Sequence, residues 1–377
     1  VVRSFVVLGP LGPSKQGPVK SAALVLDPLP KRSPRPNNGV MDATRDTTGD
    51  TTNMRAVFAQ AYGPPASLTV GEFPKPQAAP GQVLVAVKAA GVAFHDGLQL
   101  AGKHQIKYDM PYVPGMEIAG TVAALGDNTE GPAIGTPVMA LSQGGGWGEF
   151  AAVEASQVWP VPADVDFPVV AALSMAYTTA HCGLHWEGRV APRETVLVTG
   201  ASGAVGLGAV EIAKALGARV IAVASSAERL AVAAEHGADE GIDYTAVSVK
   251  DAVMELTNGQ GVDVAFDPVM GGLYEDVLAS LGWGGRHVII GFAGGAIPQI
   301  PSNRLLVKNR RALGMVMRYY RYMKPALMRE TVDTLLAWQR DGRIRPRIAE
   351  VMALERAPEI LQSIMDRKLI GRAILKP

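Results

Sequence analysis

The feature that most constrains this chain is the segment at residues 195–209, Thr-Val-Leu-Val-Thr-Gly-Ala-Ser-Gly-Ala-Val-Gly-Leu-Gly-Ala. Its first five residues are β-branched or apolar and predict a buried strand, and a helix is predicted at Val205–Leu216. A glycine-rich turn between a strand and a helix lets the backbone approach a ligand closely, and the helix N-terminus offers free amides to phosphates. The segment therefore predicts a dinucleotide site. The alternative interpretation is an ordinary strand–helix turn.

The turn departs from the usual G-x-G-x-x-G pattern at one place. Ala201 stands where the first glycine is expected, and Gly203 and Gly206 occupy the other two places. We expect the cofactor to be held along the whole turn, by Ala201, Ser202, Gly203, Ala204, Val205 and Gly206.

Beyond the turn, near-continuous apolar strands alternate with helices, which is typical of a parallel sheet buried on both faces. Further strands are predicted at Arg219–Ala224, Gly241–Tyr244, Val262–Asp267 and Arg286–Gly291, and helices at Ala227–His236, Val249–Thr257 and Leu273–Leu281. We therefore predict an α/β fold with a Rossmann doubly wound parallel sheet over residues 171–318.

The chain before this sheet has a different pattern. From Met54 to about Pro162, short β-prone runs are separated by Gly-Asp, Pro-Gly and Gly-Gly turns, which predicts a compact β-rich domain. The predicted strands are Arg55–Ala59, Ser67–Glu72, Gln82–Ala89, Glu117–Leu125, Pro137–Leu141 and Gly148–Val153. A helix is predicted at Phe167–Leu184. Residues 319–377 can rejoin the first domain, so we assign 54–170 and 319–377 to it.

The choice between the two nicotinamide dinucleotides depends on the end of the second strand. NAD sites usually place Asp or Glu there to hold the ribose hydroxyls. This chain has small hydroxyl residues instead, Ser225 and Ser226, and Arg229 follows one turn later. An arginine can pair with a 2′-phosphate, so NADPH is favoured over NADH. The alternative interpretation of Arg229 is a solvated charge on the helix, next to Glu228.

Composition limits the partners. The apolar fraction is 48%, and 36 basic and 35 acidic residues leave a net charge of +1, so no strong field favours nucleic acid or an acidic membrane. Cys182 is the single cysteine, which excludes an intrachain disulfide and a thiolate cluster. No run of about 18 uncharged apolar residues is present. We expect a cytoplasmic protein without a membrane partner.

The first 53 residues are rich in proline, glycine, threonine and basic residues and show no sustained periodicity. We expect them to be a disordered extension rather than a signal peptide, with the ordered protein starting at Met54.

Two histidines, His181 and His185, have helical i, i+4 spacing, and Cys182 is adjacent. Zinc sites need three or four converging ligands, so packing on an apolar helix is the favoured interpretation of this pair. No H-E-x-x-H, nucleophile elbow or P-loop is present. The sequence therefore gives no support to covalent catalysis.

Several further motifs, in one order from Met54 to Pro377, resemble the zinc-independent quinone oxidoreductase branch of the medium-chain dehydrogenase/reductase family. Besides the turn and Met54–Val57, the resemblance is carried by Gly91–Asp96, Val113–Gly120, Ala238–Tyr244, Gly261–Pro268 and Ile370–Leu375. It implies that the β-rich domain is GroES-like and that the protein is a reductase forming a homodimer.

The resemblance also implies roles for individual residues. Ser226, Arg229 and Tyr244 would face the 2′-phosphate, and Thr179, Gly291 and Phe292 would lie by the nicotinamide. Zinc-dependent relatives carry a cysteine ligand where this chain has Ala93 and a histidine where it has Met116, so no zinc is expected. The zinc-free relatives commonly have Asn at the place of Ala93, and its loss leaves the group on the acceptor side unassigned.

We predict hydride transfer from NADPH to a small-molecule electron acceptor, a quinone or an activated C=C bond, in a cleft between the domains. A quinone needs no positioned acid, whereas an enone or enoyl thioester benefits from a donor near the developing enolate. Candidate catalytic residues are Asp96, His104, Tyr108, Tyr112 and Thr179. The alternative interpretation of His104, Tyr108 and Tyr112 is packing within their loop, and that of Asp96 is orientation of the loop alone. The alternatives are an enoyl-thioester or α,β-unsaturated carbonyl reductase and, in another class, an NADPH-binding structural or regulatory protein with little turnover.

Overall fold

The computed structural model describes residues 52–377. The prediction of a disordered extension over residues 1–53 therefore falls almost wholly outside the described residues. The first described strand, β1, begins at Asn53.

The six-stranded sheet that carries the dinucleotide turn is parallel throughout, in the order β10-β9-β8-β11-β12-β13. Its strands are β8 (Thr195–Thr199), β9 (Arg219–Ala224), β10 (Glu240–Asp243), β11 (Val262–Asp267), β12 (Leu281–Ile289) and β13 (Arg311–Gly314). The order reverses between β8 and β11, where ligands bind in doubly wound sheets. The predicted fold class is confirmed.

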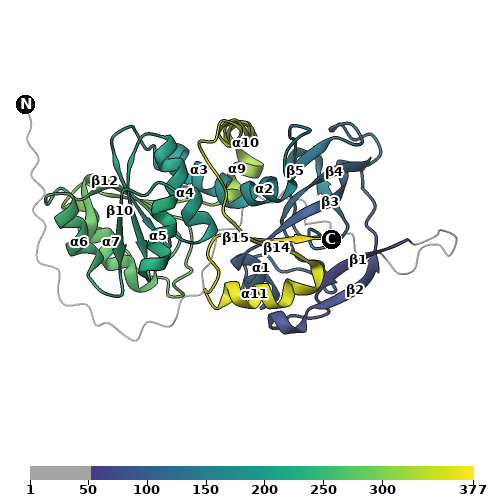
Figure 1. Ribbon diagram of the computed structural model, residues 1–377, viewed down its shortest axis with the longest axis horizontal. Helices are drawn as coiled ribbons and strands as arrows, with labels where there is room; N and C mark the ends of the chain where they lie inside the picture. Colours follow the sequence, from purple (N-terminus) through teal and green to yellow (C-terminus); the bar gives the residue numbers. More distant parts are fainter. Residues whose placement is uncertain (1–51) are drawn as a thin grey trace, which may run out of the picture. The chain divides into compact units, whose positions relative to one another are not determined.

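Alternate side chains of these strands point to opposite faces. Val196 and Val198 belong to a core cluster shared with α4, whereas Leu197 belongs to a second cluster shared with α6 and α7. Both faces of the sheet are therefore covered by helices. These are α4 (Ala204–Ala215), α5 (Ala227–Glu235), α6 (Val249–Leu256) and α7 (Tyr274–Ser280) (Figure 1). A further short helix, α8 (Ser302–Leu306), precedes β13. Neither α8 nor β13 was predicted from the sequence.

The second large sheet has seven strands in the order β14-β15-β3-β4-β5-β7, with β6 paired to β3. Its strands are β3 (Gln82–Val92), β4 (Glu117–Leu125), β5 (Pro137–Leu141), β6 (Phe150–Glu154), β7 (Val158–Pro160), β14 (Ile348–Ala353) and β15 (Arg372–Lys376). Strand β15 pairs antiparallel with β3, so the end of the chain completes a sheet begun near its start (Figure 1). A separate hairpin joins β1 (Asn53–Phe58) and β2 (Thr69–Pro74).

The remaining helices lie around this second sheet and beside α4. They are α1 (Phe94–Leu100), α2 (Phe167–Ala172), α3 (Thr178–His181), α9 (Met317–Met323), α10 (Pro325–Arg340) and α11 (Ala357–Met365). Two π-helical segments, Leu173–Tyr177 and Cys182–Glu187, make α2 and α3 parts of one helical stretch. Single 3-10 turns occur at Pro65–Ser67, Ala155–Gln157, Gly271–Leu273 and Leu354–Arg356.

The helical stretch Phe167–Glu187 is long and apolar enough, by length and composition alone, to cross a membrane. The stretch has 21 residues, and the mean hydropathy of its most apolar part is 1.2. Of that part, 83% is buried inside the protein. A helix so covered by its own chain has the properties of a core helix. Leu173, Ala176 and Tyr177 indeed belong to the core cluster shared with α4.

Candidate active site

The dinucleotide turn is shaped by close backbone packing at one glycine. A Cβ atom on Gly206 would lie 2.8 Å from the Cα of Ala201 and closer still to the carbonyl oxygen of Gly200, so only glycine fits there. Gly200 has a φ of +59°, which favours glycine as well. Gly203 differs, because a Cβ there would meet only the Gly200 oxygen, at 3.5 Å. The helix thus packs on the turn through Gly206 and leaves open space beside Gly203.

The start of α4 fits a pyrophosphate. Gly203 caps this 12-residue helix in an extended conformation, and its first turn contains no acidic residue. The first amides of a helix have no acceptor within the helix, and the helix dipole favours an anion there. Ala204 and Val205 contribute such amides, so the predicted residues of the turn are arranged as a phosphate site requires.

A buried carboxylate that the sequence did not single out holds the strand end behind the turn. Asp267 accepts hydrogen bonds from the Thr199 hydroxyl at 2.6 Å and the Met270 amide at 2.8 Å. It also lies 2.9 Å from His287 Nε2 and accepts from the Val269 amide at 3.0 Å. Burial opposes its ionisation, but the hydrogen bonds from His287 and Thr199 outweigh burial and lower the pKa of Asp267. This network ties β8, β11 and β12 together beneath Gly200.

The residues predicted to face the 2′-phosphate come together at the ends of two adjacent strands. Ser225 and Ser226 follow β9, Tyr244 follows β10, and the Tyr244 amide donates to Ala224 at 3.1 Å. Ser226 caps α5 by accepting from the Arg229 amide at 3.3 Å, which leaves its own O–H free to donate. The Tyr244 side chain is 38% exposed, so its hydroxyl can meet a ligand.

Arg229 is half-buried and bonded rather than a solvated helix charge. Its Nη1 donates to Ser202 Oγ in the turn at 3.1 Å, and its Nη2 donates to the Arg367 carbonyl at 2.6 Å. The guanidinium therefore lies beside the turn itself. No role was predicted from the sequence for the segment that supplies this carbonyl.

That segment, residues 366–371 between α11 and β15, lies against the turn. The Gly371 amide donates to the Ser202 carbonyl at 3.0 Å, and Gly371 forms a bridge with Gly203. Arg367 Nη2 donates to the Ala293 carbonyl at 2.6 Å. Ala293 follows Gly291 and Phe292, the two residues predicted to lie beside the nicotinamide. Phe292 is 39% exposed. The motif Ile370–Leu375 was a sequence signal for this segment, but nothing in it indicated contact with the turn.

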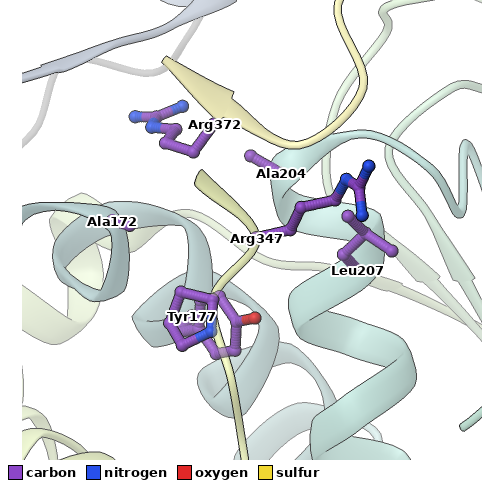
Figure 2. A pocket seen from close by; sticks show the side chains of 7 residues that line it. Ala172, Tyr177, Ala204, Leu207, Arg347 and Arg372 are labelled. Atoms are coloured by element: carbon purple, nitrogen blue, oxygen red, sulfur yellow. The ribbon is translucent and has the colours of Figure 1, made fainter. Parts of the chain in front are cut away.

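A small cavity lies behind the start of α4 (Figure 2). It is lined by Ala172, Tyr177, Ala204, Leu207, Pro346, Arg347 and Arg372. Its volume is about 10 Å³, which is roughly the space that one water molecule occupies, so the cavity is far smaller than an ordinary ligand pocket. The Tyr177 hydroxyl donates to Glu211 of α4 at 2.7 Å. Thr179, which was predicted to lie beside the nicotinamide, is buried two residues after Tyr177. Arg372 of β15 and Ala204 of α4 both line this cavity, so Arg372 lies close to the dinucleotide turn.

The predicted acceptor-side tyrosines are buried and stacked. The rings of Tyr108 and Tyr112 lie 4.8 Å apart and nearly parallel, and Gln99 Nε2 donates to the Tyr108 hydroxyl at 3.3 Å. Burial, reinforced by Asp96, raises the pKa of Tyr108 to about 12. The same causes raise the pKa of Tyr112 further. Both phenols are therefore hydrogen-bond donors at neutral pH and weak acids.

His104 and Asp96 have fixed partners. His104 Nδ1 accepts from the Ile106 amide at 3.2 Å, and burial lowers the pKa of this half-buried ring. Asp96 is 1% exposed, and its Oδ2 accepts from the Ala93 amide at 2.7 Å. Its Oδ1 lies 3.4 Å from Nε2 of His95, which is not among the predicted catalytic residues. Asp96 can therefore act on a ligand only through its neighbours. The adjacent His-Asp pair in the motif Gly91–Asp96 was the sequence signal that could have drawn attention to His95.

Apolar side chains, Ala93 and Met116, stand at the two positions where the resemblance implies zinc ligands in zinc-dependent relatives. Ala93 and Met116 are both buried, and Met116 Sδ accepts from Gln99 Nε2 at 3.3 Å. Glu117, after Met116, pairs with Arg372 instead. Within residues 52–377 no three His, Cys, Asp or Glu side chains are grouped closely enough to hold a metal ion.

The pair His181 and His185 is part of an aromatic cluster. Their rings lie 5.0 Å apart, and His181 Nδ1 is 3.1 Å from the Thr331 hydroxyl, which also accepts from Trp186 Nε1 at 3.0 Å. Burial and then His185 lower the pKa of His181 to about 3. A neutral, hydrogen-bonded ring against Trp338 of α10 has the environment of a packing residue.

The alcohol dehydrogenase GroES-like domain matches residues 79–163, and the zinc-binding dehydrogenase domain matches residues 204–334. A quinone oxidoreductase-like protein 2 homolog of Nematostella vectensis is 38% identical over 326 residues, covering 86% of this chain and 89% of the relative. The chain therefore belongs to the medium-chain dehydrogenase/reductase family. Within it, the relatives are of the quinone oxidoreductase branch, as predicted.

Two solved structures agree with this assignment. The Escherichia coli quinone oxidoreductase complexed with NADPH has a TM-score of 0.80 at 26% identity, over 86% of this chain and 100% of that one. A mycobacterial protein complexed with NADPH has a TM-score of 0.80 at 30% identity, with the same coverage. This chain is thus an oxidoreductase, and the two solved relatives named here are complexed with NADPH.

Proposed function

We propose that the protein is an NADPH-dependent reductase that passes hydride to a quinone-like acceptor without zinc. The observation that carries the proposal is the turn at Gly200–Gly206, with Arg229 held against Ser202 by a 3.1 Å hydrogen bond. Bound NADPH would supply the hydride. The chain's own contribution is to hold the pyrophosphate at α4 and the 2′-phosphate among Ser226, Arg229 and Tyr244.

The choice of NADPH rests on charge and hydrogen-bonding capacity. No carboxylate stands at the end of β9 to receive the ribose hydroxyls of NAD, and the side chains there can donate to a phosphate. Arg229 is partly occupied by the Arg367 carbonyl, so a 2′-phosphate would compete for that bond. A phosphate is the stronger acceptor because its hydrogen bonds are charge-assisted on both sides.

The proposal of zinc independence rests on donor chemistry. A methyl group and a thioether stand where zinc-dependent relatives supply thiolate and imidazole, and neither suits an open catalytic zinc site. Reduction by hydride transfer to a quinone needs no Lewis acid, since the product oxyanion can be protonated by water.

We also propose that the protein works as a homodimer in the cytoplasm. Among residues 52–377, strand β13 is an edge of the parallel sheet with backbone groups free to pair. Nearby exposed apolar side chains, Trp283 at 77%, Leu306 at 81% and Val307 at 64%, favour burial against a second copy. Light scattering of wild type and Trp283→Lys would test it: a dimer that dissociates in the variant is expected, and a wild-type monomer would overturn it.

The experiment that tests the activity is an acceptor panel. NADPH oxidation is followed with 1,4-quinones, enones and enoyl-CoA esters, each repeated with NADH. Turnover of quinones with NADPH in preference to NADH is expected. Preference for enones or enoyl thioesters would select the α,β-unsaturated carbonyl reductase instead. Tight NADPH binding with no turnover of any acceptor would favour a structural or regulatory NADPH-binding protein.

A further inference from the structure

Arg321 of α9 is a buried cation that no carboxylate neutralises within residues 52–377. It is 5% exposed, its Nε donates to Gln157 Oε1 at 2.8 Å, and its Nη2 donates to the Leu141 carbonyl at 2.6 Å. Both acceptors are neutral, and no acidic side chain of the described residues lies within 4.0 Å of the guanidinium. Burial lowers the pKa of Arg321, while Glu154 raises it from beyond ion-pair distance. Because a buried charge without a partner of opposite sign is costly, an anion that reached this guanidinium would be bound favourably.

The guanidinium is fixed in place and still has a free donor. Gln157 binds Arg321 twice, because its Nε2 also donates to the Arg321 backbone carbonyl at 3.1 Å. Gln157 itself is 1% exposed. The second terminal nitrogen of Arg321, Nη1, has no hydrogen-bond partner among the described residues, and it is not one of their fully buried unpaired atoms. Part of Nη1 is therefore accessible, and it can donate to a ligand from a side chain that is already held in position.

Strand pairing places this guanidinium near a position that the resemblance assigns to the catalytic centre. Leu141 is the last residue of β5 and pairs with Glu117 of β4. The next residue, Ser142, continues the pairing, since its amide donates to the Met116 carbonyl at 2.9 Å. Arg321 Nη2 lies 3.4 Å from the Ser142 carbonyl. The guanidinium is therefore at the end of β5 that lies opposite Met116.

A second connection joins α9 to the tyrosines predicted on the acceptor side. Tyr322 follows Arg321, and its hydroxyl accepts from Gln143 Nε2 at 3.0 Å. The next residue, Gly144, packs close to Tyr112, because a Cβ atom on it would lie 3.7 Å from Tyr112 Cδ2. The middle of α9 is thus connected to the stacked tyrosines through one short loop after β5.

The start of α9 lies beside the segment predicted to hold the nicotinamide. The Met315 amide donates to the Ile289 carbonyl at 3.0 Å, so the residues after β12 and β13 leave the parallel sheet side by side. Gly291 follows two residues after Ile289, and α9 begins at Met317, two residues after Met315. Arg321 is about one helical turn, roughly 6 Å, further along the helix. It therefore lies between the predicted nicotinamide segment and the predicted acceptor side.

We propose that Arg321 binds the acceptor through an anionic substituent of the carboxylate class, so that the protein prefers acidic acceptors to neutral ones. The inference rests on the proposed function, because the acceptor is the molecule that bound NADPH reduces. A charge-assisted hydrogen bond from Nη1 would orient the acceptor and supply the counter-ion that the buried guanidinium lacks. Arg318 adds a second positive charge, since its guanidinium lies 5.8 Å from the Tyr322 ring, against 5.3 Å for Arg321.

The kinetic test compares an acidic and a neutral quinone with the same rings, 1,4-naphthoquinone-2-sulfonate and 1,4-naphthoquinone. Wild type should have the lower KM for the sulfonate. Arg321→Met should lower the ratio of kcat/KM for the sulfonate to kcat/KM for the neutral quinone by about 10- to 100-fold, the size of a hydrogen bond to a charged group. Arg321→Lys keeps the charge but loses the fork, so its ratio should fall by less.

Arg329→Met is the matched control for these variants. Arg329 is exposed on α10, so its loss removes the same charge from the surface and should change the ratio by less than about 2-fold. An unchanged ratio in Arg321→Met, or a wild-type preference for the neutral quinone, would overturn the proposal.

Direct binding separates this inference from the proposed activity. In calorimetric titrations, 2-naphthoate should bind wild type more tightly than the uncharged 2-naphthol does, and at least about 10-fold more tightly than it binds Arg321→Met. Equal affinity of 2-naphthoate for the two proteins would overturn the proposal. So would tighter binding of 2-naphthol to wild type, a comparison that needs no folded variant. If wild type selects 2-naphthoate but reduces no quinone, the proposed function fails and the anion site stands.

Discussion

The dinucleotide turn and the acceptor side of the site differ in what builds them. The turn is a backbone structure: Gly206 lets α4 touch Gly200, and Asp267 has hydrogen bonds to both carboxylate oxygens. The acceptor side is built from side chains, and Asp96 Oδ1, Gln99 Oε1 and the Tyr112 hydroxyl have no partner among residues 52–377. Within the described residues the Asp267 network has one unpaired buried group of its own, His287 Nδ1, against several on the acceptor side. Hydrogen bonds to both oxygens of a buried carboxylate make a region rigid, whereas unpaired buried polar groups weaken it and leave it ready for a ligand. We therefore expect mutations in the two regions to have opposite signatures.

The largest effect is expected where the turn's support is removed. Asp267→Ala leaves His287 and the Thr199 hydroxyl without their partner inside the sheet and should lower the free energy of unfolding by about 3–5 kcal/mol. Urea denaturation followed by tryptophan fluorescence measures it. The control is Asp164→Ala, an exposed aspartate, with a change within about 0.5 kcal/mol. Equal effects of the two substitutions would break the distinction between the regions.

The two glycines of the turn should respond very differently. Gly206→Val forces a side chain against the Gly200 carbonyl and Ala201, so NADPH affinity should fall at least about 100-fold if the protein folds. Gly203→Ala adds one methyl group with an ordinary contact at 3.5 Å, and affinity should fall by less than about 10-fold. Titration of NADPH fluorescence measures both. Similar losses for the pair would contradict the packing assigned to Gly206.

A smaller and more selective effect is expected at the 2′-phosphate. Arg229→Ala should weaken NADPH binding by about 10- to 100-fold, the size of a charge-assisted pair, and NADH binding by less than about 3-fold. Fluorescence titrations with both dinucleotides give the ratio. Arg340→Ala, an exposed arginine on α10, serves as the control. A parallel loss of both affinities would remove the argument for NADPH.

The smallest change in stability is expected on the acceptor side. Gln99 is buried, and its Oε1 has no partner in the described part of the chain. Replacing a half-satisfied buried amide with a side chain of similar volume is near neutral, so Gln99→Met should shift the free energy of unfolding by less than about 1 kcal/mol. It should still raise KM for the acceptor, since Tyr108 loses the hydrogen bond that orients it. A loss as large as that of Asp267→Ala would show that the acceptor side is equally built for stability.

The sequence predicted the backbone-built region almost completely. The predicted bounds of β8, β9, β11 and α4 agree with the structure within a residue because apolar periodicity and glycine placement act over a few neighbouring positions. Strands β7 and β13 and helices α1 and α8 were not predicted, and the strand predicted at Arg286–Gly291 misses the first five residues of β12. They are short, and β13 is a sheet strand because β12 lies beside it, not because of its own pattern.

The acceptor side depends on contacts that no local pattern encodes. His95 and Asp96 are neighbours in sequence, but their environment includes Arg372 and Arg321, which lie more than 200 residues away along the chain. The approach of residues 366–371 to Ser202 is a tertiary contact of the same kind. Burial also decides which tyrosine or histidine can act as an acid, and it is a property of the folded chain alone.

The most direct test of a zinc-free NADPH-dependent reductase is the rate of NADPH oxidation with 1,4-benzoquinone, measured before and after exhaustive treatment with a zinc chelator. Turnover that the chelator leaves unchanged is expected, in protein that contains less than stoichiometric zinc. Turnover that disappears with the chelator and returns with added Zn²⁺ would contradict the account, as would the absence of turnover in untreated, NADPH-binding protein.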